Sequence, residues 1–224
     1  MKDDDKKKVL NIAKHYNNIE HAERYFRCGP PVNISDRIRD KEFQTVFSNL
    51  NLDELPSNNP KALDIGVGGG RYTMYLVKRG INTIGIDTGI NLLKWASERV
   101  DATFIRASVT DLPFKKEVFD LVICIELLHH FEDEVLEKVL EEIRGVIKPG
   151  GIFVFDVKNK MNLYLKYKYK DDERAGIAYR ARTIRQMIKF AENNGFKFVK
   201  KKGIYFPITL FAPFIIVFCK KSNK

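Results

Sequence analysis

The chain has 224 residues, 44% of them hydrophobic, and a formal net charge of +10. This is enough for one globular domain with a proper core, and the positive charge admits a polyanionic partner such as RNA or an anionic membrane surface. Three cysteines, Cys28, Cys124 and Cys219, lie far apart without a CxxC pair. This spacing argues against a disulfide framework or a metal site and favours a reducing, cytoplasmic setting.

The first 60 residues differ in character from the rest, and we expect residues 1–60 to form a helical cap that covers the substrate. The start, MKDDDKKKVLN, is a charge run with no apolar segment behind it, so no signal peptide is predicted. Residues 34–50 have apolar side chains at helical spacing, which predicts a helix over the sheet or over a ligand cleft. The aromatic residues Tyr16, Tyr25 and Phe26 are candidates for part of a substrate lid.

From residue 61 onward, apolar runs alternate with longer amphipathic segments, a pattern typical of parallel strands joined by crossover helices. We predict an α/β, doubly wound fold with a mostly parallel seven-stranded sheet and an antiparallel last strand. The stretch 206–213 is too short for a crossover helix, so the two strands beside it should pair antiparallel. The predicted strands are 61–65, 82–86, 102–107, 119–125, 151–157, 196–205 and 214–220, and the predicted helices between them are 71–79, 89–99, 132–147 and 183–194.

A glycine-rich loop follows the first predicted strand. Asp64 lies near the end of that strand, and Gly66, Gly68 and Gly70 follow it in a D-x-G-x-G-x-G spacing, with a helix expected directly afterwards. Glycines allow a sharp turn and let a ligand lie against bare backbone, and the helix N-terminus offers unpaired amide donors. The pattern predicts a nucleoside-like ligand. It does not fit the dinucleotide fingerprint G-x-G-x-x-G, whose third glycine would fall on an arginine or a threonine.

The glycine loop resembles motif I of the class I S-adenosylmethionine (SAM) dependent methyltransferases, and further motifs follow in the family's order over roughly residues 61–220. These are GID at the second strand, ASVTDLPF after the third, FDLVICIELLHHF at the fourth and IKPGGIFVFD leading into the fifth. The resemblance implies a Rossmann-like, SAM-binding methyltransferase domain over residues 61–224. It also implies SAM as the cofactor and a methyl transfer that requires no metal.

The resemblance also assigns residues to the cofactor. Asp64 holds the loop through backbone amides or meets the methionine amino group, and Asp87 accepts hydrogen bonds from the ribose hydroxyls or caps the next helix. Where the family usually has an aspartate for the adenine amino group, this chain has Ser108, a weaker acceptor. The expected cofactor-binding residues are Asp64, Gly66, Gly68, Gly70, Asp87, Thr88, Ser108, Val109 and Glu126.

The ELLHH stretch after the fourth predicted strand holds the candidate catalytic residues Glu126, His129 and His130. They would lie at the carboxyl end of that strand, which opens into the ligand crevice of a doubly wound sheet. A histidine there can take a proton from an attacking hydroxyl, whereas in the family that this chain resembles such histidines often only shape the loop. Glu126 is an alternative base, or a site for a substrate ammonium group.

The methyl acceptor should be selected outside the shared core, by residues 1–60 and by a predicted lid insertion at 158–182. Within that insertion, tyrosines interleave with lysines over residues 164–170, which suits single-stranded RNA, an anionic membrane interface or a solvated lid. The apolar stretch 204–219 is too short and too proline-interrupted to span a membrane, and its FPITLFAPF loop, if exposed, favours an apolar substrate or peripheral membrane contact. We therefore expect methyl transfer to a small-molecule, apolar or lipid-like acceptor. A tRNA or other RNA methyltransferase and a non-catalytic SAM-binding partner subunit are the alternatives.

Overall fold

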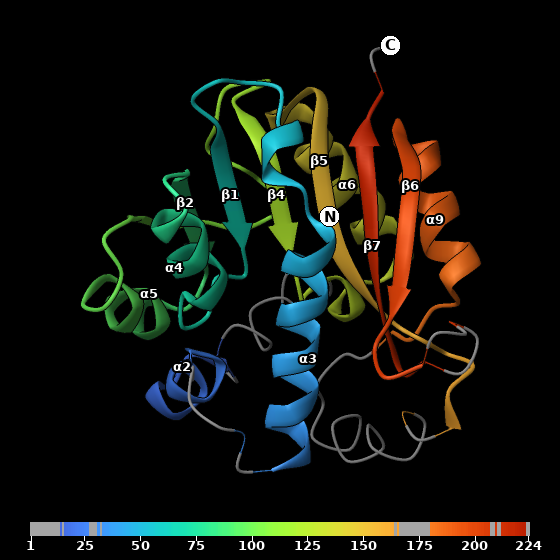
Figure 1. Ribbon diagram of the computed structural model, residues 1–224, viewed down its shortest axis with the longest axis horizontal. Helices are drawn as coiled ribbons and strands as arrows, with labels where there is room; N and C mark the ends of the chain where they lie inside the picture. The colour runs from blue at the N-terminus through green and yellow to red at the C-terminus, as the bar shows by residue number, and fades with distance from the viewer. Residues whose placement is uncertain are drawn as a thin grey trace.

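The computed structural model describes residues 14, 16–26, 31, 33–163, 165, 180–206, 209 and 212–222 (Figure 1). Several of the predictions fall on other residues. Cys28, the charged start, most of the predicted lid insertion and parts of the FPITLFAPF loop lie outside the described residues, as does the side chain of Tyr25.

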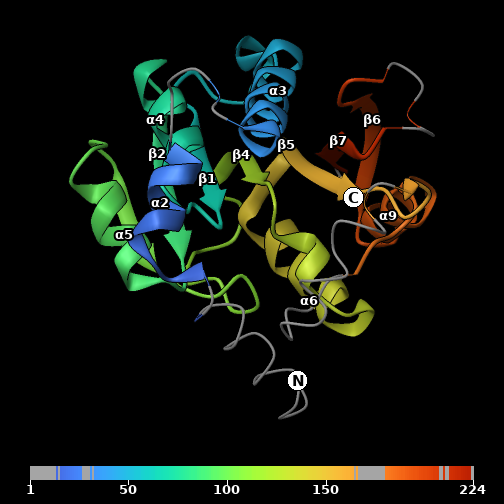
Figure 2. The ribbon, with the colours of Figure 1, turned by 90° about the horizontal axis from the view of Figure 1, so that it is seen from below.

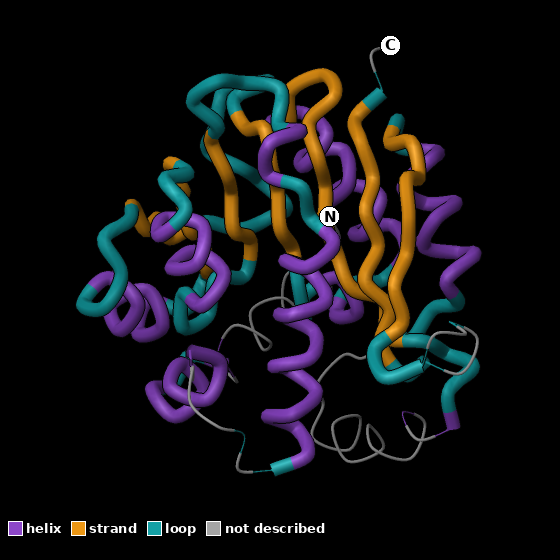
Figure 3. The backbone as a smooth tube through the Cα atoms, viewed as in Figure 1, coloured by secondary structure: helices purple, strands orange, loops and turns teal. Residues whose placement is uncertain are grey.

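Seven strands form one sheet in the order β3-β2-β1-β4-β5-β7-β6 (Figure 3). They are β1 (Lys61–Ile65), β2 (Asn82–Asp87), β3 (Thr103–Arg106), β4 (Phe119–Cys124), β5 (Ile147–Lys158), β6 (Phe196–Gly203) and β7 (Phe214–Lys221). The neighbours from β3 to β5 pair parallel, whereas β7 runs antiparallel to both β5 and β6. The predicted doubly wound sheet with a reversed last strand is confirmed, and the short connection from β6 to β7 is the reason for the reversal.

Two strand limits differ from the prediction. Strand β5 begins at Ile147 rather than Gly151, because Ile147 already pairs with Phe119 before a shift in register. Strand β6 ends at Gly203 rather than Tyr205, whose positive φ of 66° turns the chain out of the sheet.

The helices are α2 (Ile19–Phe26), α3 (Ile34–Asn49), α4 (Arg71–Lys78), α5 (Ile90–Ser97), α6 (Asp133–Val146) and α9 (Ile184–Asn193), with single 3₁₀ turns η1 (Leu52–Glu54) and η2 (Leu128–His130). The helices after residue 61 are each slightly shorter than predicted, because end residues of the predicted ranges act as caps. Gly89 and Glu132 are the N-caps of α5 and α6. Thr183 forms a capping box with Gln186 at the start of α9, which satisfies amide groups that the helix itself leaves unpaired.

The sheet is covered on both faces, and alternate residues of β5 show the division. Phe153 and Phe155 pack into one apolar cluster with residues of α6 and α9, whereas Ile152 and Val154 pack into a second cluster with residues of α3 and α4. Successive side chains of a strand point to opposite faces, so continuous apolar runs are required here. Figure 2 shows α3 and α4 on one side of the sheet and α6 on the other.

Two further features bear on the predictions. None of the helices among the described residues is long and apolar enough to cross a membrane. In the described part of the FPITLFAPF loop, Phe206 is 47% exposed, whereas Ala212 and the adjoining Phe214 are buried.

The strand order reverses between β1 and β4, since β2 and β3 lie on one side of this pair and β5, β7 and β6 on the other. In an open α/β sheet, ligands bind outside the carboxyl ends of the strands at this switch point. The loops that leave β1, β2 and β4 there contain the glycine cluster, Asp87 and the ELLHH stretch.

Candidate active site

The glycine loop turns from β1 into α4 through three residues in the left-handed region. Gly66, Gly68 and Gly70 have φ angles of 73°, 51° and 83°. The backbone amides of Gly66 and Val67 donate to the carbonyl of Ile86 at 2.9 and 3.0 Å, which ties the loop to the end of β2. Side chains rarely adopt these φ angles, so the alternating glycines are required by the turn itself.

Asp64 is buried at the end of β1, and its carboxylate holds the first turn of α4. Its Oδ2 accepts from the backbone amide of Thr73 at 3.0 Å and from the Thr73 hydroxyl at 2.7 Å. Burial outweighs these hydrogen bonds and raises the pKa of Asp64 to about 6. Asp64 also lines the cavity described below, so the side chain that holds α4 also lies beside the expected ligand.

Asp87 ends β2 and binds two backbone amides. Its Oδ2 accepts from Gly68 at 3.1 Å, and its Oδ1 accepts from Gly89 at 2.8 Å. It therefore supports both the glycine loop and the start of α5. Each carboxylate oxygen accepts more than one hydrogen bond, so the same side chain still has capacity for ribose hydroxyls. Burial raises its pKa despite these contacts.

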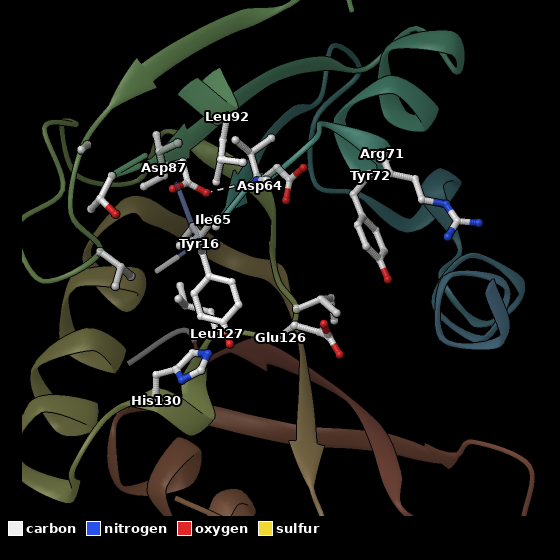
Figure 4. Close-up of a pocket in the computed structure, with 18 of the residues that line it drawn as sticks. Tyr16, Asp64, Ile65, Arg71, Tyr72, Asp87, Leu92, Glu126, Leu127 and His130 are labelled. Atoms are coloured by element: carbon white, nitrogen blue, oxygen red, sulfur yellow. Dashed lines mark hydrogen bonds between the residues drawn. The ribbon is translucent and has the colours of Figure 1, made fainter. Parts of the chain in front are cut away.

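A cavity opens beside these residues, and Figure 4 shows how its labelled side chains lie. Asp64 and Asp87 stand close together at one end, Arg71 and Tyr72 stand to one side, and Glu126, Leu127 and His130 face them from the loop after β4. We call the first part the cofactor end and define it by Asp64, Gly66, Gly68, Ile86, Asp87, Thr88, Leu92, Ser108 and Val109. We call the second part the acceptor end and define it by Tyr16, Arg39, Glu42, Arg71, Tyr72, Ile125, Glu126, Leu127, His130 and Phe131.

The structure brings most of the predicted site residues together on this cavity. Of the expected cofactor-binding residues, all except Gly70 line it. Gly70 lies behind the loop, where an added Cβ would meet the side chain of Ala96 at 3.3 Å. Among the candidate catalytic residues, Glu126 and His130 line the cavity, and His129 is not among its lining residues.

Ser108 lines the cofactor end with its hydroxyl engaged in a local turn. Its Oγ lies 2.8 Å from Oγ1 of Thr110 and accepts from the Thr110 backbone amide at 3.3 Å. Ile86, Leu92 and Val109 supply apolar surface at the same end of the cavity. A flat base against these side chains would therefore be held chiefly by apolar contact, with the serine as a weak polar partner.

The loop after β4 places Glu126 in a strained conformation. Glu126 has a positive φ of 59°, which is uncommon for a residue with a side chain. Its backbone amide donates to Oδ1 of Asp156 at 2.7 Å, and its carboxylate accepts from Nζ of Lys158 at 2.7 Å. Strained residues held by surrounding contacts cluster at functional sites, and these contacts hold Glu126 on the cavity wall.

The two histidines differ in their surroundings. The ring of His130 lies 5.5 Å from that of Tyr16, across the acceptor end. His129 is half-buried beside it with ring centroids 4.1 Å apart. Desolvation of its ring, together with the charges of His130, Lys158 and Arg182, lowers the pKa of His129 well below its ordinary value. His129 is therefore neutral at pH 7, while His130 is the histidine that a ligand in the cavity would meet.

Several lining residues were not predicted from the sequence. Arg39 and Glu42 come from α3, and Arg71 and Tyr72 come from the first turn of α4. Arg39 and Glu42 are three residues apart, a spacing that puts them on one helix face, but that spacing is equally typical of a solvated face. Tyr16, which was named as a lid candidate, does line the cavity.

A SAM molecule fits the chemistry of this cavity. The carboxylates of Asp64, which is buried, and Asp87, which is half-buried, suit an ammonium group and a ribose. The apolar side chains of the cofactor end suit a base, and the left-handed glycines leave the loop backbone bare. The described residues contain no group of three or more histidine, cysteine or acidic side chains arranged to hold a metal ion.

Comparison with known proteins gives relatives that include several methyltransferases and an arginine-hydroxylase. A family model described as a methyltransferase domain matches residues 63–155. An uncharacterized methyltransferase of Synechocystis is 37% identical over 109 residues, which cover 48% of this chain and about half (51%) of that protein. An uncharacterized protein of Methanocaldococcus jannaschii is 32% identical over 171 residues, which cover 75% of this chain and 70% of that protein.

Two further relatives have names that state a substrate. A ubiquinone biosynthesis O-methyltransferase of Colwellia psychrerythraea is 29% identical over 162 residues, which cover 66% of this chain and 65% of that protein. A tRNA (carboxymethyluridine(34)-5-O)-methyltransferase of Arabidopsis thaliana is 34% identical over 111 residues, which cover 47% of this chain and 26% of that protein.

Among solved structures, magnesium protoporphyrin IX methyltransferase from Synechocystis with bound SAH superimposes with a TM-score of 0.74 at 19% identity, covering 95% of this chain and 99% of that chain. At this identity the likeness shows the shared fold.

Proposed function

Because this chain belongs to the class I SAM-dependent methyltransferases, we propose that it transfers the methyl group of SAM to a small molecule bound at the acceptor end of the cavity. The proposal rests on one observation, the enclosure of the acceptor end by buried side chains. Glu42 of α3 and His130 of the loop after β4 line it, yet both side chains are buried. Tyr16 of the N-terminal segment also lines it. A site whose walls come from three separate segments suits a small acceptor.

The lining of the acceptor end describes the kind of molecule it would take. Ile125, Leu127 and Phe131 are apolar, whereas Arg39 and Glu42 are charged. An amphiphilic small molecule would suit this lining, with its apolar part on Ile125, Leu127 and Phe131 and a polar group against α3. The ubiquinone relative covers more of this chain than the tRNA relative does, which also supports a small-molecule acceptor.

Bound SAM supplies a methyl group that is already activated by its sulfonium sulfur, so the protein needs chiefly to hold two reactants in line. Asp64 would hold the amino group of SAM, and Asp87 would hold its ribose. The walls of the acceptor end would orient the acceptor and exclude water. Such positioning corresponds to effective molarities on the order of 10⁵ to 10⁸ M. Glu126 and His130, which both line the cavity, would take a proton from a hydroxyl acceptor.

The test is to incubate the protein with methyl-labelled SAM and a cell extract and to separate small molecules, lipids, RNA and protein before counting label. We expect label in small molecules. An Asp87→Ala variant should lose SAM binding and all transfer, whereas Glu141→Gln, on an exposed position of α6, should leave both unchanged.

A second candidate is methyl transfer to RNA, favoured by the net charge of +10 and by the tRNA relative. It predicts label in the RNA fraction and retention of the protein on RNA that weakens steeply as salt rises, because phosphate contacts release counterions. Label in RNA alone would replace the small-molecule proposal.

A further inference from the structure

Glu42 is the most deeply buried acidic residue at the acceptor end. It is only 1% exposed, although it lies in the middle of α3, a helix with an open side. Its Oε1 atom is buried and has no hydrogen-bond partner among the described residues. Since Glu42 lines the cavity, this oxygen belongs to a polar side chain that the fold brings to the cavity wall without a partner from the part of the chain that the structure describes.

The cationic groups nearby have carboxylate partners of their own. Nζ of Lys158 lies 2.7 Å from Oε1 of Glu126 and 3.2 Å from Oδ2 of Asp156, and the side chain of Lys158 is 1% exposed. On α3, Arg39 is paired with Asp36.

Arg71 of α4, the other arginine of the acceptor end, is paired with Asp40 and lies over the ring of Phe43, with its Cζ 4.4 Å from the ring centroid. Both arginines are thus engaged with other side chains of α3. Among the described residues, Oε1 of Glu42 and Oδ2 of Asp156 are buried carboxylate oxygens without a hydrogen bond, but Oδ2 of Asp156 lies 3.2 Å from Nζ of Lys158, whereas Oε1 of Glu42 has no such cation beside it.

Counted over the described residues, the buried charges around Lys158 also do not balance. Glu42, Glu126 and Asp156 are three carboxyl groups within electrostatic reach of the single ammonium of Lys158. Burial raises the pKa of Glu42 well above its ordinary value, and the neighbouring carboxylates raise it further while Lys158 and Arg39 oppose the rise. A buried polar group without a partner is costly, so a fold that keeps one at a cavity wall has a use for it.

We propose that the methyl acceptor carries a basic nitrogen, such as an amine, and that Glu42 is the residue that binds it. This inference rests on the proposed function and specifies its substrate class. A protonated amine would give Oε1 of Glu42 a charged hydrogen-bond partner and would correct the excess of carboxyl groups. The same excess would offset the repulsion between such an amine and the sulfonium charge of bound SAM. The apolar residues of the acceptor end would hold the rest of the molecule.

The experiment compares wild type, Glu42→Gln, Glu42→Asp and the control Glu141→Gln, with SAM affinity measured by calorimetry and folding checked by thermal melting. Each is incubated with methyl-labelled SAM and the small-molecule fraction of a cell extract, and the products are passed over a cation exchanger at pH 7. Glutamine has nearly the shape of glutamate without its charge. Glu42→Gln should therefore fold and bind SAM as wild type does.

We expect the labelled products to be retained on the exchanger and their labelling to fall about tenfold or more in Glu42→Gln, since hydrogen bonds to charged groups are the stronger ones. Glu42→Asp, which keeps the charge on a shorter side chain, should retain part of the labelling, and Glu141→Gln should retain all of it. Hexylamine should also inhibit labelling by the wild type more strongly than hexanol, and this difference should vanish in Glu42→Gln.

Two results would overturn the inference, and they are distinguishable. Labelled small molecules that are neutral or anionic, formed equally by Glu42→Gln, would refute the role of Glu42 while the proposed function stands. Label confined to RNA would refute the proposed function and the inference together.

Discussion

Individual carboxylates in this molecule serve the fold and the site at once. Asp64 binds the first turn of α4 through Thr73, and Asp87 binds the amides of Gly68 and Gly89, yet both side chains line the cavity. Their burial raises the pKa of each. A site built from such residues is already ordered before a ligand arrives, which reduces the entropy lost on binding.

Asp64 makes a prediction about stability and pH. Its pKa is raised from 3.8 to about 6 in the folded protein, so the folded state binds more protons than the unfolded state over that interval. Stability contributed by protonated Asp64 is present below pH 3.8 and is lost as pH rises through about 6. The unfolding free energy of Asp64→Asn relative to wild type should therefore rise by about 2 kcal/mol between pH 4 and pH 7.

Urea denaturation of both proteins across this pH range measures the difference and cancels the contribution of all other titrating groups. Thr110→Ser, a conservative change at a buried threonine of another turn, is the control and should keep the pH dependence of the wild type. A constant difference between Asp64→Asn and wild type would contradict the raised pKa.

Lys158 makes a second prediction at this scale. Replacing it by methionine would remove the ammonium group that pairs with Glu126 and Asp156 and should lower the unfolding free energy by about 3–5 kcal/mol, the usual cost of breaking a buried ion pair from one side. Lys220→Met is the control, because Lys220 is 39% exposed and lies 3.6 Å from Glu54, and should change the unfolding free energy by less than about 0.5 kcal/mol. Equal effects of the two changes in urea denaturation would contradict this account.

At the scale of elements, the N-terminal segment connects two parts of the site that follow different strands. These are the glycine loop after β1 and helix α5 after β2. Helix α2 packs on the glycine loop, where an added Cβ on Gly69 would lie 2.3 Å from the carbonyl of Ala22. The side chain of Asn17, just before α2, accepts from the backbone amide of Asn91 in α5 at 2.9 Å. Phe26 at the end of α2 packs edge-on against Trp95, with ring centroids 4.8 Å apart. Helix α2 therefore fastens the loop to α5.

This contact can be tested by Gly69→Ala. The new methyl group would collide with backbone rather than with a flexible side chain, so α2 has to move away from the loop. Since Trp95 is the single tryptophan of the chain, its fluorescence should shift to longer wavelength as Phe26 leaves.

The matched control is Gly145→Ala in α6, where nothing lies within 4 Å of an added Cβ. It should leave the fluorescence unchanged and should stabilise the protein by about 0.5–1 kcal/mol, because alanine favours a helix interior. An unshifted fluorescence spectrum in Gly69→Ala would show that the position of α2 does not depend on its close contact with Gly69.

At the scale of the whole molecule, binding and stability are linked. Loops from β1, β2 and β4 and helices α3, α4 and α5 all contribute to one cavity, so a ligand there contacts only the folded chain. A ligand at 100 times its dissociation constant then adds about 2.7 kcal/mol to the unfolding free energy. We expect SAM and SAH to raise the melting temperature by an amount that grows with concentration.

Asp87→Ala should abolish this rise, and Glu141→Gln should keep it. Differential scanning fluorimetry at several ligand concentrations measures it. A rise in melting temperature that survives in Asp87→Ala would place the cofactor outside the cofactor end.

Local patterns in the sequence were enough to predict the succession of strands and helices along the chain from residue 61, the reversed β7 and the glycine turn. The continuous apolar runs, the short link before β7 and the spacing of Asp64, Gly66, Gly68 and Gly70 each constrain the nearby backbone directly. Most of the expected cofactor-binding residues line the cavity for the same reason, since they lie in loops at the carboxyl ends of predicted strands.

Only the tertiary structure decided what lies at the acceptor end. It separated His130, on the cavity wall, from His129, and it placed Glu42 of α3 within electrostatic reach of Lys158 at the end of β5. A charged residue on an amphipathic helix is expected to face water, and whether it does depends on the surface against which the helix packs. That surface comes from strands far away in the chain, so no local spacing in the sequence specifies it.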